Sequence, residues 1–459
     1  LFNSPIFYDA TRPSVVASSA VAAATNAAFE VTFSFSEGVN EFALEDITVE
    51  NGVASAFTKV NHEVYTVSVM PTAEGAVKVS VAENKAVDPS LNGNTASNMI
   101  STLYDVTKPA VELYSKSAEH VNTPFTVAFT FSEPVSGFTM ADINVVNGTA
   151  AHFENANNRV FTALITPTAD GEVKISVAAD VAFDAATNGN EASAELKRIY
   201  DATRPETVVA TTASNPTNAP FTATFTFSEE VAGFEIGDVA VTNGSASDFV
   251  NVDGKAYRAV ITPAADGEVT VSVAEGKAQD IATNGNKSSN LLKLEYDGTS
   301  PSLVVATAAA NPSNTAFNVT FTFGEEVTGF EAGDVTVVNA TLSGFVQQSA
   351  LVYAATVTPA ADGQVLVSVA AGVAVDAATN GNLASNEVSI LYDVAKPTVA
   401  LTTPAADPTN APFTVTFTFS EPVTGFAQGD ISVTNATVSD LTAASTSVYT
   451  ARVTPTADG

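Results

Sequence analysis

The stretch "FTATFTFS" (Phe221–Ser228) decides the fold, because apolar and polar side chains alternate along all of it. Three phenylalanines and an alanine take every second place, and threonines and a serine stand between them. A period of two is typical of a β-strand that buries one face. Similar segments surround it, separated by clusters of Asn, Gly, Pro and Asp, and none carries a helical period of useful length. The predicted strands of this region are 207–213, 221–228, 238–243, 247–251, 256–263, 267–274 and 288–296.

Seven short strands in one such region predict an all-β fold. An immunoglobulin-like β-sandwich has about seven strands in about 100 residues, with frequent turns. A small β-barrel is the competing all-β prediction, whereas propeller blades of about 40–50 residues are too short for this unit. We therefore expect an Ig-like β-sandwich.

The same pattern recurs along the chain at a fixed interval of 96 residues, without insertion or deletion. We therefore expect a tandem array of sandwiches, each large enough to bury a core of its own. Because the sequence stops inside a repeat, we expect it to be a piece of a longer array. The predicted domains are residues 1–8, the end of a preceding repeat or an N-terminal tail, and the Ig-like repeats 9–104, 105–200, 201–296, 297–392 and 393–459, of which the fifth is incomplete.

The composition limits both the partners and the means of stabilisation. Without cysteine, each repeat must be held by packing or by bound ions instead of disulfides. Acidic residues outnumber basic residues 50 to 18, and the formal net charge is −32. Such a charge repels phosphate backbones and attracts cations, so we expect no nucleic-acid partner. No apolar run approaches the roughly 20 residues of a membrane span, so we expect no membrane insertion in this segment.

Several motifs recur almost unchanged: "FTFSEPVSGF" (129–138), "FTFSEEVAGF" (225–234) and "FTFSEPVTGF" (417–426), followed by "ITPTADGEV" and "DAATNGN". They resemble the bacterial Ig-like repeats of very large tandem-repeat surface proteins, including adhesins. The resemblance covers the whole chain and implies an extracellular extender at the cell surface, a stalk that holds a binding domain away from a cell. The chain departs from full-length members in having no glycine- and aspartate-rich nonapeptide tail, wall anchor or distinct tip domain, so the kind of surface protein stays open.

Alternating strands bring the acids of each repeat to one end, the leading pole, where the chain enters the sandwich. The opposite pole of the second repeat adds Asp170 to the junction with the third. Ca²⁺ takes six to eight oxygen ligands, so the sequence predicts a Ca²⁺ site at each junction, to which Asn284 or Asn286 gives a carbonyl. In the third repeat the acids are Asp201, Glu229, Asp238 and Asp280. Their equivalents are Asp9, Glu37, Asp46 and Asp88; Asp105, Glu133, Asp142 and Asp184; Asp297, Glu325, Asp334 and Asp376; and Asp393, Glu421 and Asp430.

These residues also have simpler interpretations. The Asn-Gly pairs, such as 284–285, favour hairpin turns because both residues accept positive φ, and we favour this turn role for the amides. Asp280 could bond backbone N–H groups of its own loop, and Glu229 could be a solvated acid at the rim. Four Asn-x-Ser/Thr sequons are also 96 residues apart, and for these we favour turn chemistry over glycosylation. The sequon residues are Asn147, Asn243, Asn339 and Asn435.

The chain offers little for catalysis, and we predict that it is not an enzyme. Its histidines, His62, His120 and His152, occupy different positions within their repeats. This excludes a repeated catalytic triad, and the absence of cysteine excludes a thiol nucleophile. Two functions remain. One is a cell-surface stalk whose partners are its own neighbouring repeats; the alternative is a subunit of a self-assembling extracellular filament, sheath or appendage whose partners are copies of itself.

Overall fold

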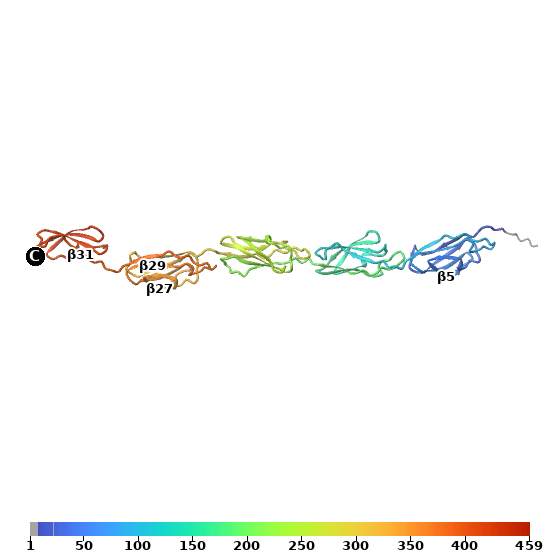
Figure 1. Cartoon of the computed structure of the whole chain (residues 1–459), viewed down its shortest axis with the longest axis horizontal. Coiled ribbons are helices and arrows are strands. Elements are labelled where there is room, and N and C mark those ends of the chain that lie inside the picture. Colours follow the sequence, from blue (N-terminus) through green and yellow to red (C-terminus); the bar gives the residue numbers. More distant parts are fainter. Residues whose placement is uncertain (1–7, 22) are drawn as a thin grey trace, which may run out of the picture.

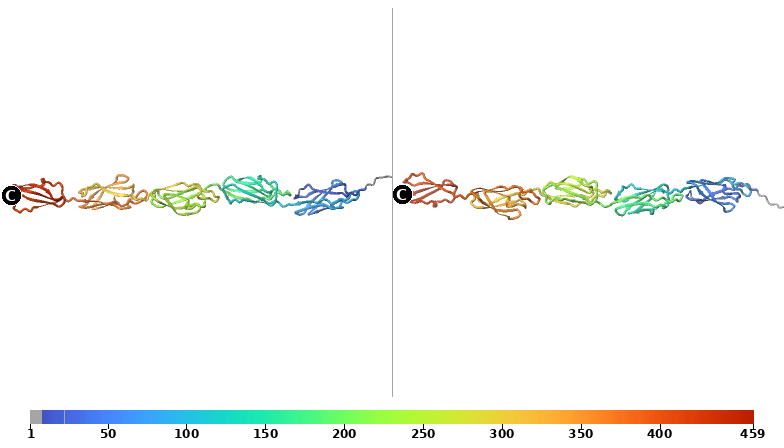
Figure 2. Two further views of the ribbon diagram at one scale, coloured as in Figure 1. Left: turned by 90° about the horizontal axis from the view of Figure 1, so that it is seen from above. Right: turned by 60° about the horizontal axis from the view of Figure 1, so that its bottom comes forward.

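Five β-rich units follow one another in a single row, in the order of the sequence (Figure 1 and Figure 2). The computed structural model describes residues 8–21 and 23–459. Each of the first four repeats forms two sheets, and the fifth forms one four-stranded sheet. The predicted segment 1–8 lies outside the described residues, except for Tyr8.

The alternating stretch forms β18 (Phe221–Phe227), the second strand of the third repeat. Its phenylalanines and alanine are buried, and the threonines between them are exposed or half-buried. The predicted number of seven strands is confirmed. They are β17 (Thr207–Ala210), β18, β19 (Val239–Thr242), β20 (Gly244–Asn251), β21 (Ala256–Pro263), β22 (Gly267–Val273) and β23 (Leu292–Tyr296), with a 3₁₀ helix, η3 (Ile236–Asp238), before β19.

These strands form two separate sheets, in the order β17-β18-β21-β20 and β19-β22-β23. All pairings within them are antiparallel. Four strands facing three is the arrangement of an Ig constant-type sandwich. The all-β, Ig-like prediction is therefore confirmed, and the competing barrel is not formed.

The first two repeats follow this plan with one addition, a two-residue second strand that pairs in parallel with the last strand of the repeat. The first has β1 (Val15–Ser18), β2 (Ala24–Thr25), β3 (Phe29–Phe35), η1 (Leu44–Asp46), β4 (Ile47–Glu50), β5 (Gly52–Lys59), β6 (Val64–Pro71), β7 (Gly75–Val81) and β8 (Ile100–Tyr104). The second has β9 (Val111–Tyr114), β10 (His120–Val121), β11 (Phe125–Phe131), η2 (Met140–Asp142), β12 (Ile143–Val146), β13 (Gly148–Asn155), β14 (Val160–Pro167), β15 (Gly171–Val177) and β16 (Leu196–Tyr200).

The fourth and fifth repeats complete the row. The fourth has β24 (Leu303–Thr307), β25 (Phe317–Phe323), η4 (Ala332–Asp334), β26 (Val335–Val338), β27 (Ala340–Gln347), β28 (Val352–Pro359), β29 (Gly363–Val369) and β30 (Val388–Tyr392). The fifth has β31 (Val399–Thr402), β32 (Phe413–Phe419), η5 (Gln428–Asp430), β33 (Ala436–Ala443) and β34 (Val448–Pro455). Among the described residues, no helix is long and apolar enough to cross a membrane.

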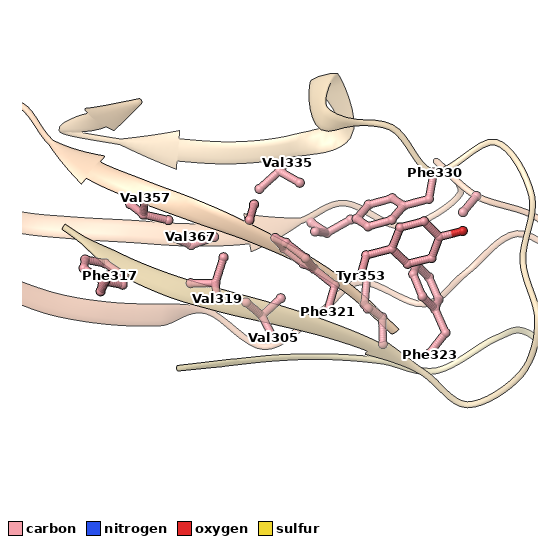
Figure 3. Packing of buried hydrophobic residues seen from close by; sticks show 14 of the residues in the cluster. Val305, Phe317, Val319, Phe321, Phe323, Phe330, Val335, Tyr353, Val357 and Val367 are labelled. Atoms are coloured by element: carbon pink, nitrogen blue, oxygen red, sulfur yellow. The ribbon is translucent and has the colours of Figure 1, made fainter. Parts of the chain in front are cut away.

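In the first four repeats the core lies between the two sheets and has a cluster of aromatic rings at one end. In the fourth repeat Phe330 packs edge-on against Phe323 and Tyr353, with ring centroids 5.1 Å apart in both pairs (Figure 3). Valines such as Val319 and Val367 fill the rest of the space between the sheets (Figure 3). Edge-to-face pairs add to the stability that burial alone provides.

The last strand of the third repeat is shorter than the predicted 288–296, because Asn290 bonds elsewhere. Asn290 Oδ1 accepts the backbone N–H of Val209 at 2.8 Å, and Asn290 Nδ2 donates to the carbonyl of Val209 at 2.9 Å. This side chain therefore ties the end of the long loop to β17 instead of extending β23.

Candidate cation site at the repeat junctions

Three of the four predicted acids of each complete repeat come together at its leading pole. In the third repeat Asp201 begins the repeat, Glu229 follows β18, and Asp280 lies in the loop between β22 and β23. One carboxylate oxygen from each residue lies within 4.8 Å of the other two. Asp280 is 5% exposed, whereas Asp201 and Glu229 are half-buried. The spacing fits one Ca²⁺, because oxygens on opposite sides of that ion lie about 5 Å apart.

The same group recurs in every complete repeat. The other groups are Asp9, Glu37 and Asp88; Asp105, Glu133 and Asp184; and Asp297, Glu325 and Asp376. In the fifth repeat Asp393 and Glu421 line a surface hollow together with residues 308–310 and 312–318 of the fourth repeat. The equivalent of Asp280 would lie beyond residue 459 of the sequence.

Two asparagines shape the loop that carries Asp280. Asn284 donates its backbone N–H to Asp280 Oδ1 and its Nδ2 to Asp280 Oδ2, both at 2.8 Å. The same Nδ2 donates to the backbone carbonyl of Asp201 at 2.8 Å. Asn286 is fully buried and accepts two consecutive backbone N–H groups of the loop at 2.7 and 2.8 Å. The carboxylate of Asp280 is thereby held beside the first residue of the repeat.

The Asn-Gly pair of this loop is not a positive-φ turn. The positive φ, 71°, belongs to Thr283, and neither Asn284 nor Gly285 has one. Glycine suits this place because a Cβ on Gly285 would lie 3.1 Å from the Cα of Gly276, closer than ordinary van der Waals contact. The amides therefore shape the loop through their side-chain hydrogen bonds, and the predicted φ mechanism is corrected.

The structure places the remaining predicted aspartate outside the acidic group. Asp238 Oδ2 accepts the backbone N–H of Glu235 at 3.0 Å, and Asp238 Oδ1 pairs with Lys277 Nζ at 3.3 Å. The carboxylate turns to the start of η3 because free N–H groups there need an acceptor. The same correction applies to Asp46, Asp142, Asp334 and Asp430, each of which accepts the N–H three residues before it.

A side-chain hydrogen bond joins the groups of the second, third and fourth repeats to the preceding repeat. Asn122 Nδ2, from the loop before β11, donates to Asn284 Oδ1 at 3.1 Å. The two side-chain carbonyl oxygens that were predicted to bind Ca²⁺ therefore accept hydrogen bonds instead. Asn284 Oδ1 accepts one from Asn122 of the preceding repeat. Asn286 Oδ1 accepts two from backbone N–H groups of its own loop. The same contact between repeats, also 3.1 Å long, joins Asn26 to Asn188 and Asn218 to Asn380. Sequence reasoning missed the first asparagine of each pair, although its recurrence every 96 residues was a signal.

A second contact holds the linker between repeats. Asp170, from the loop between β14 and β15, accepts the backbone N–H of Ala202 at 2.8 Å and the hydroxyl of Thr203. Asp266 holds the next linker in the same way. The threonine hydroxyl and then the backbone N–H lower the pKa of both aspartates. The end of one repeat that lies opposite its leading pole therefore holds the linker to the next repeat through these hydrogen bonds.

The acids of each group repel one another. Burial raises the pKa of Glu229, and the charges of Asp201, Asp280 and, from the preceding repeat, Asp170 raise it further, whereas Lys255 opposes them. The pKa values of the equivalent glutamates are raised by burial and by neighbouring aspartates: Glu37, Glu133 and Glu325. A proton or a cation between the carboxylates relieves this repulsion.

We expect mild acid to stabilise the repeats when no divalent cation is present. Because the pKa of Glu229 in the folded protein is above 4.5, the folded protein binds a proton at pH values where the unfolded chain has released it. This group therefore adds stability as the pH falls toward 4.5 and removes it as the pH rises. Asp170, whose pKa is below 3.8, loses its hydrogen bonds only at lower pH, outside this window.

Calorimetry in a chelator should give a higher unfolding temperature at about pH 5 than at about pH 7. Replacing the four glutamates of the complete groups with glutamine should remove most of that difference. A difference of the same size in this variant would contradict the assignment.

The sequon asparagines serve a turn. Asn243 has a φ of 53° and donates its Nδ2 to the carbonyl of Ala265 at 2.7 Å. Asn51 makes the same bond to Ala73 at 2.7 Å, although Val53 removes the sequon there. The geometry exists with or without the sequon, which supports the turn interpretation.

Five tandem Ig-like repeats, with an acidic group at the leading pole of each complete one, define a repeat protein of the Ig-like class. The family model of the bacterial Ig-like domain matches residues 9–104, 105–199, 201–296, 297–392 and 393–459. The chain therefore belongs to the bacterial Ig-like domain family. The comparison with curated proteins finds no match.

Several solved structures are similar to this chain. Invasin, a bacterial integrin-binding protein, is 13% identical with a TM-score of 0.32, over 85% of this chain and 82% of that one. The tetra-tandem repeat in the extending region of a large adhesion protein is 15% identical with a TM-score of 0.32, over 83% and 100%. InvD of Yersinia pseudotuberculosis is 13% identical with a TM-score of 0.31, over 61% and 97%.

Proposed function

We propose that the chain is a stalk segment of a large extracellular cell-surface protein of the adhesin type, and that calcium stiffens its junctions. The observation that carries the proposal is the repeated junction, where three carboxylates lie within 4.8 Å at the same pole of four successive repeats. The five repeats stand in one row, so a change at each junction alters the reach of the whole chain (Figure 1). A stalk requires repeats in a row with junctions of controlled stiffness, and it requires no catalytic group.

The residues present suit Ca²⁺. Asp201, Glu229 and Asp280 offer carboxylate oxygens only, and water would supply the remaining ligands of a six- to eight-coordinate ion. A bound ion would offset the repulsion that raises the pKa of Glu229. It would also tie together the linker, the end of β18 and the loop that contacts Asn122 of the preceding repeat. Cation binding and junction stiffness are therefore coupled in this proposal.

Small-angle X-ray scattering of the whole chain, with Ca²⁺ and with a chelator in moderate salt, tests the proposal. We expect a larger maximum dimension and lower flexibility with Ca²⁺, because the ion joins segments on both sides of each junction. Calorimetry should show stabilisation by about 2.7 kcal/mol per occupied site at a free concentration of 100 times Kd.

Adjacent glutamates provide a charge-matched control. Glu229→Gln with Glu325→Gln removes a ligand from two groups, whereas Glu230→Gln with Glu326→Gln removes the same charge from exposed neighbours outside the groups. Only the first pair should weaken the response to Ca²⁺. If the dimensions of the chain do not change with Ca²⁺, or if the two variants respond equally to Ca²⁺, the proposed calcium site is rejected. Growth of the particle mass in either buffer would instead favour the filament subunit.

A further inference from the structure

Arg204 fixes the loop that carries Asp280 in the third repeat. Its Nε donates to the carbonyl of Gly285 at 2.7 Å, and its Nη2 donates to the carbonyl of Asn286 at 2.9 Å. The same Nη2 pairs with Glu275 Oε2 at 3.2 Å. Because Arg204 follows the junction closely, this guanidinium ties the linker to both sides of the loop.

Two lysines reinforce the same loop. Lys277 Nζ pairs with Asp238 Oδ1 at 3.3 Å, and Lys287 Nζ pairs with Glu206 Oε1 at 2.9 Å. We call these ion pairs and the hydrogen bonds of Arg204 the basic clamp. Charge-assisted hydrogen bonds of this kind are stronger than neutral ones, and a planar guanidinium suits two carbonyls at once.

The clamp varies between repeats. In the first repeat Arg12 donates to the carbonyls of Gly93 at 2.7 Å and Asn94 at 2.8 Å, as Arg204 does in the third. In the second repeat Lys108 takes this place and makes a single ion pair, with Asp180 Oδ1 at 3.2 Å. The loop is therefore held strongly in two repeats and less strongly in one.

The fourth repeat has no basic clamp. It contains eight acidic residues and no lysine, arginine or histidine, so no ion pair can form within it. Ser300 stands in the place of Arg204, and Ala371 in the place of Glu275. Val373 and Leu383 replace the two lysines.

The backbone of the loop is held equally in the third and fourth repeats. The N–H of Gly276 donates to the carbonyl of Asn286 at 2.9 Å, and Gly372 donates to Asn382 at the same distance. The contact to the preceding repeat is 3.1 Å long in both. The basic clamp is thus the main difference between the two loops.

We propose that, of the three junctions between the first four repeats, the one between the third and fourth repeats is the most flexible. The loop that carries Asp376 also carries Asn380, which contacts Asn218 of the third repeat. A loop without the clamp opens more often, and each opening releases that contact. The inference concerns the chain without bound cations and does not depend on the proposed function.

Spin labels measure the two junctions in a matched way, since the chain has no cysteine of its own. Thr130, Thr226 and Thr322 are exposed at equivalent places on β11, β18 and β25. Thr130→Cys with Thr226→Cys spans the second junction, and Thr226→Cys with Thr322→Cys spans the third. In a chelator we expect a distance distribution that is roughly twice as wide across the third junction.

Exchanging the clamp between repeats tests its cause. Ser300→Arg with Ala371→Glu should narrow the wide distribution, and Arg204→Ser with Glu275→Ala should widen the narrow one. Hydrogen exchange should show about tenfold lower protection in loop 370–387 than in loop 274–291. Adding the clamp should raise the protection of loop 370–387, and removing the clamp should lower the protection of loop 274–291. Unchanged exchange in β21 and β28 verifies that both variants are folded. Equal widths across the two junctions, or widths that do not follow the clamp, would overturn the proposal.

Discussion

Replacing Asn286 with alanine should lower the free energy of unfolding of the third repeat by about 4 kcal/mol. Its Oδ1 accepts the N–H groups of Lys277 and Ala278, and its Nδ2 donates to the carbonyls of Ala274 and Lys287 at 3.0 and 2.7 Å. Asn286 and Ala278 are both buried, so the N–H of Ala278 would lose its acceptor away from water. Each lost hydrogen bond costs about 1 kcal/mol, and each unsatisfied buried group adds about 1–3 kcal/mol.

Hydrogen exchange in rising urea, read on peptides of the third repeat, measures this loss. The matched control is Lys287→Ala at the next residue, where an exposed ion pair with Glu206 is lost. That variant should differ from the unchanged protein by less than about 1 kcal/mol. Equal losses in the two variants would show that Asn286 does not hold the loop.

Replacing Phe234 with alanine should destabilise the third repeat by about 4 kcal/mol and leave the other repeats unchanged. Phe234 lies at the centre of the aromatic cluster, with ring centroids 5.1 Å from both Phe227 and Tyr257 and 5.4 Å from Phe249. It is 5% exposed, so its removal leaves a cavity between the sheets. Substitutions of this kind typically cost 3–5 kcal/mol.

The same hydrogen-exchange experiment in rising urea measures the stability of every repeat in one molecule. Ile236→Ala, two residues away in the exposed start of η3, should cost less than about 1 kcal/mol. Because each of the first four repeats has its own buried cluster, we expect the loss to be confined to one repeat. A loss of similar size in the second or fourth repeat would contradict independent cores.

The strands could be predicted because each one carries its own signal. In β18 the alternation itself specifies which side chains face the core, and the fixed interval of 96 residues extends that prediction to every repeat. The convergence of Asp201, Glu229 and Asp280 also follows from antiparallel strands, since loops after alternate strands meet at one pole. Asp238 could not be assigned in this way. The sequence places Asp238 at the leading pole whether its carboxylate binds a cation or accepts a hydrogen bond at the start of η3. The structure shows that the carboxylate accepts the N–H of Glu235.

By itself, the sequence determined the strand pattern, the length of the repeat and the excess of acidic residues, because these are properties of neighbouring residues or of their sum. Only the tertiary structure decided which carboxylates share one space, which amide meets the neighbouring repeat and which loop lacks a clamp. Arg204 and the carbonyl of Gly285 are 81 residues apart, and Asn122 and Asn284 are 162 apart. Contacts at such separations depend on how loops close at the ends of two sandwiches, and no local pattern encodes that closure.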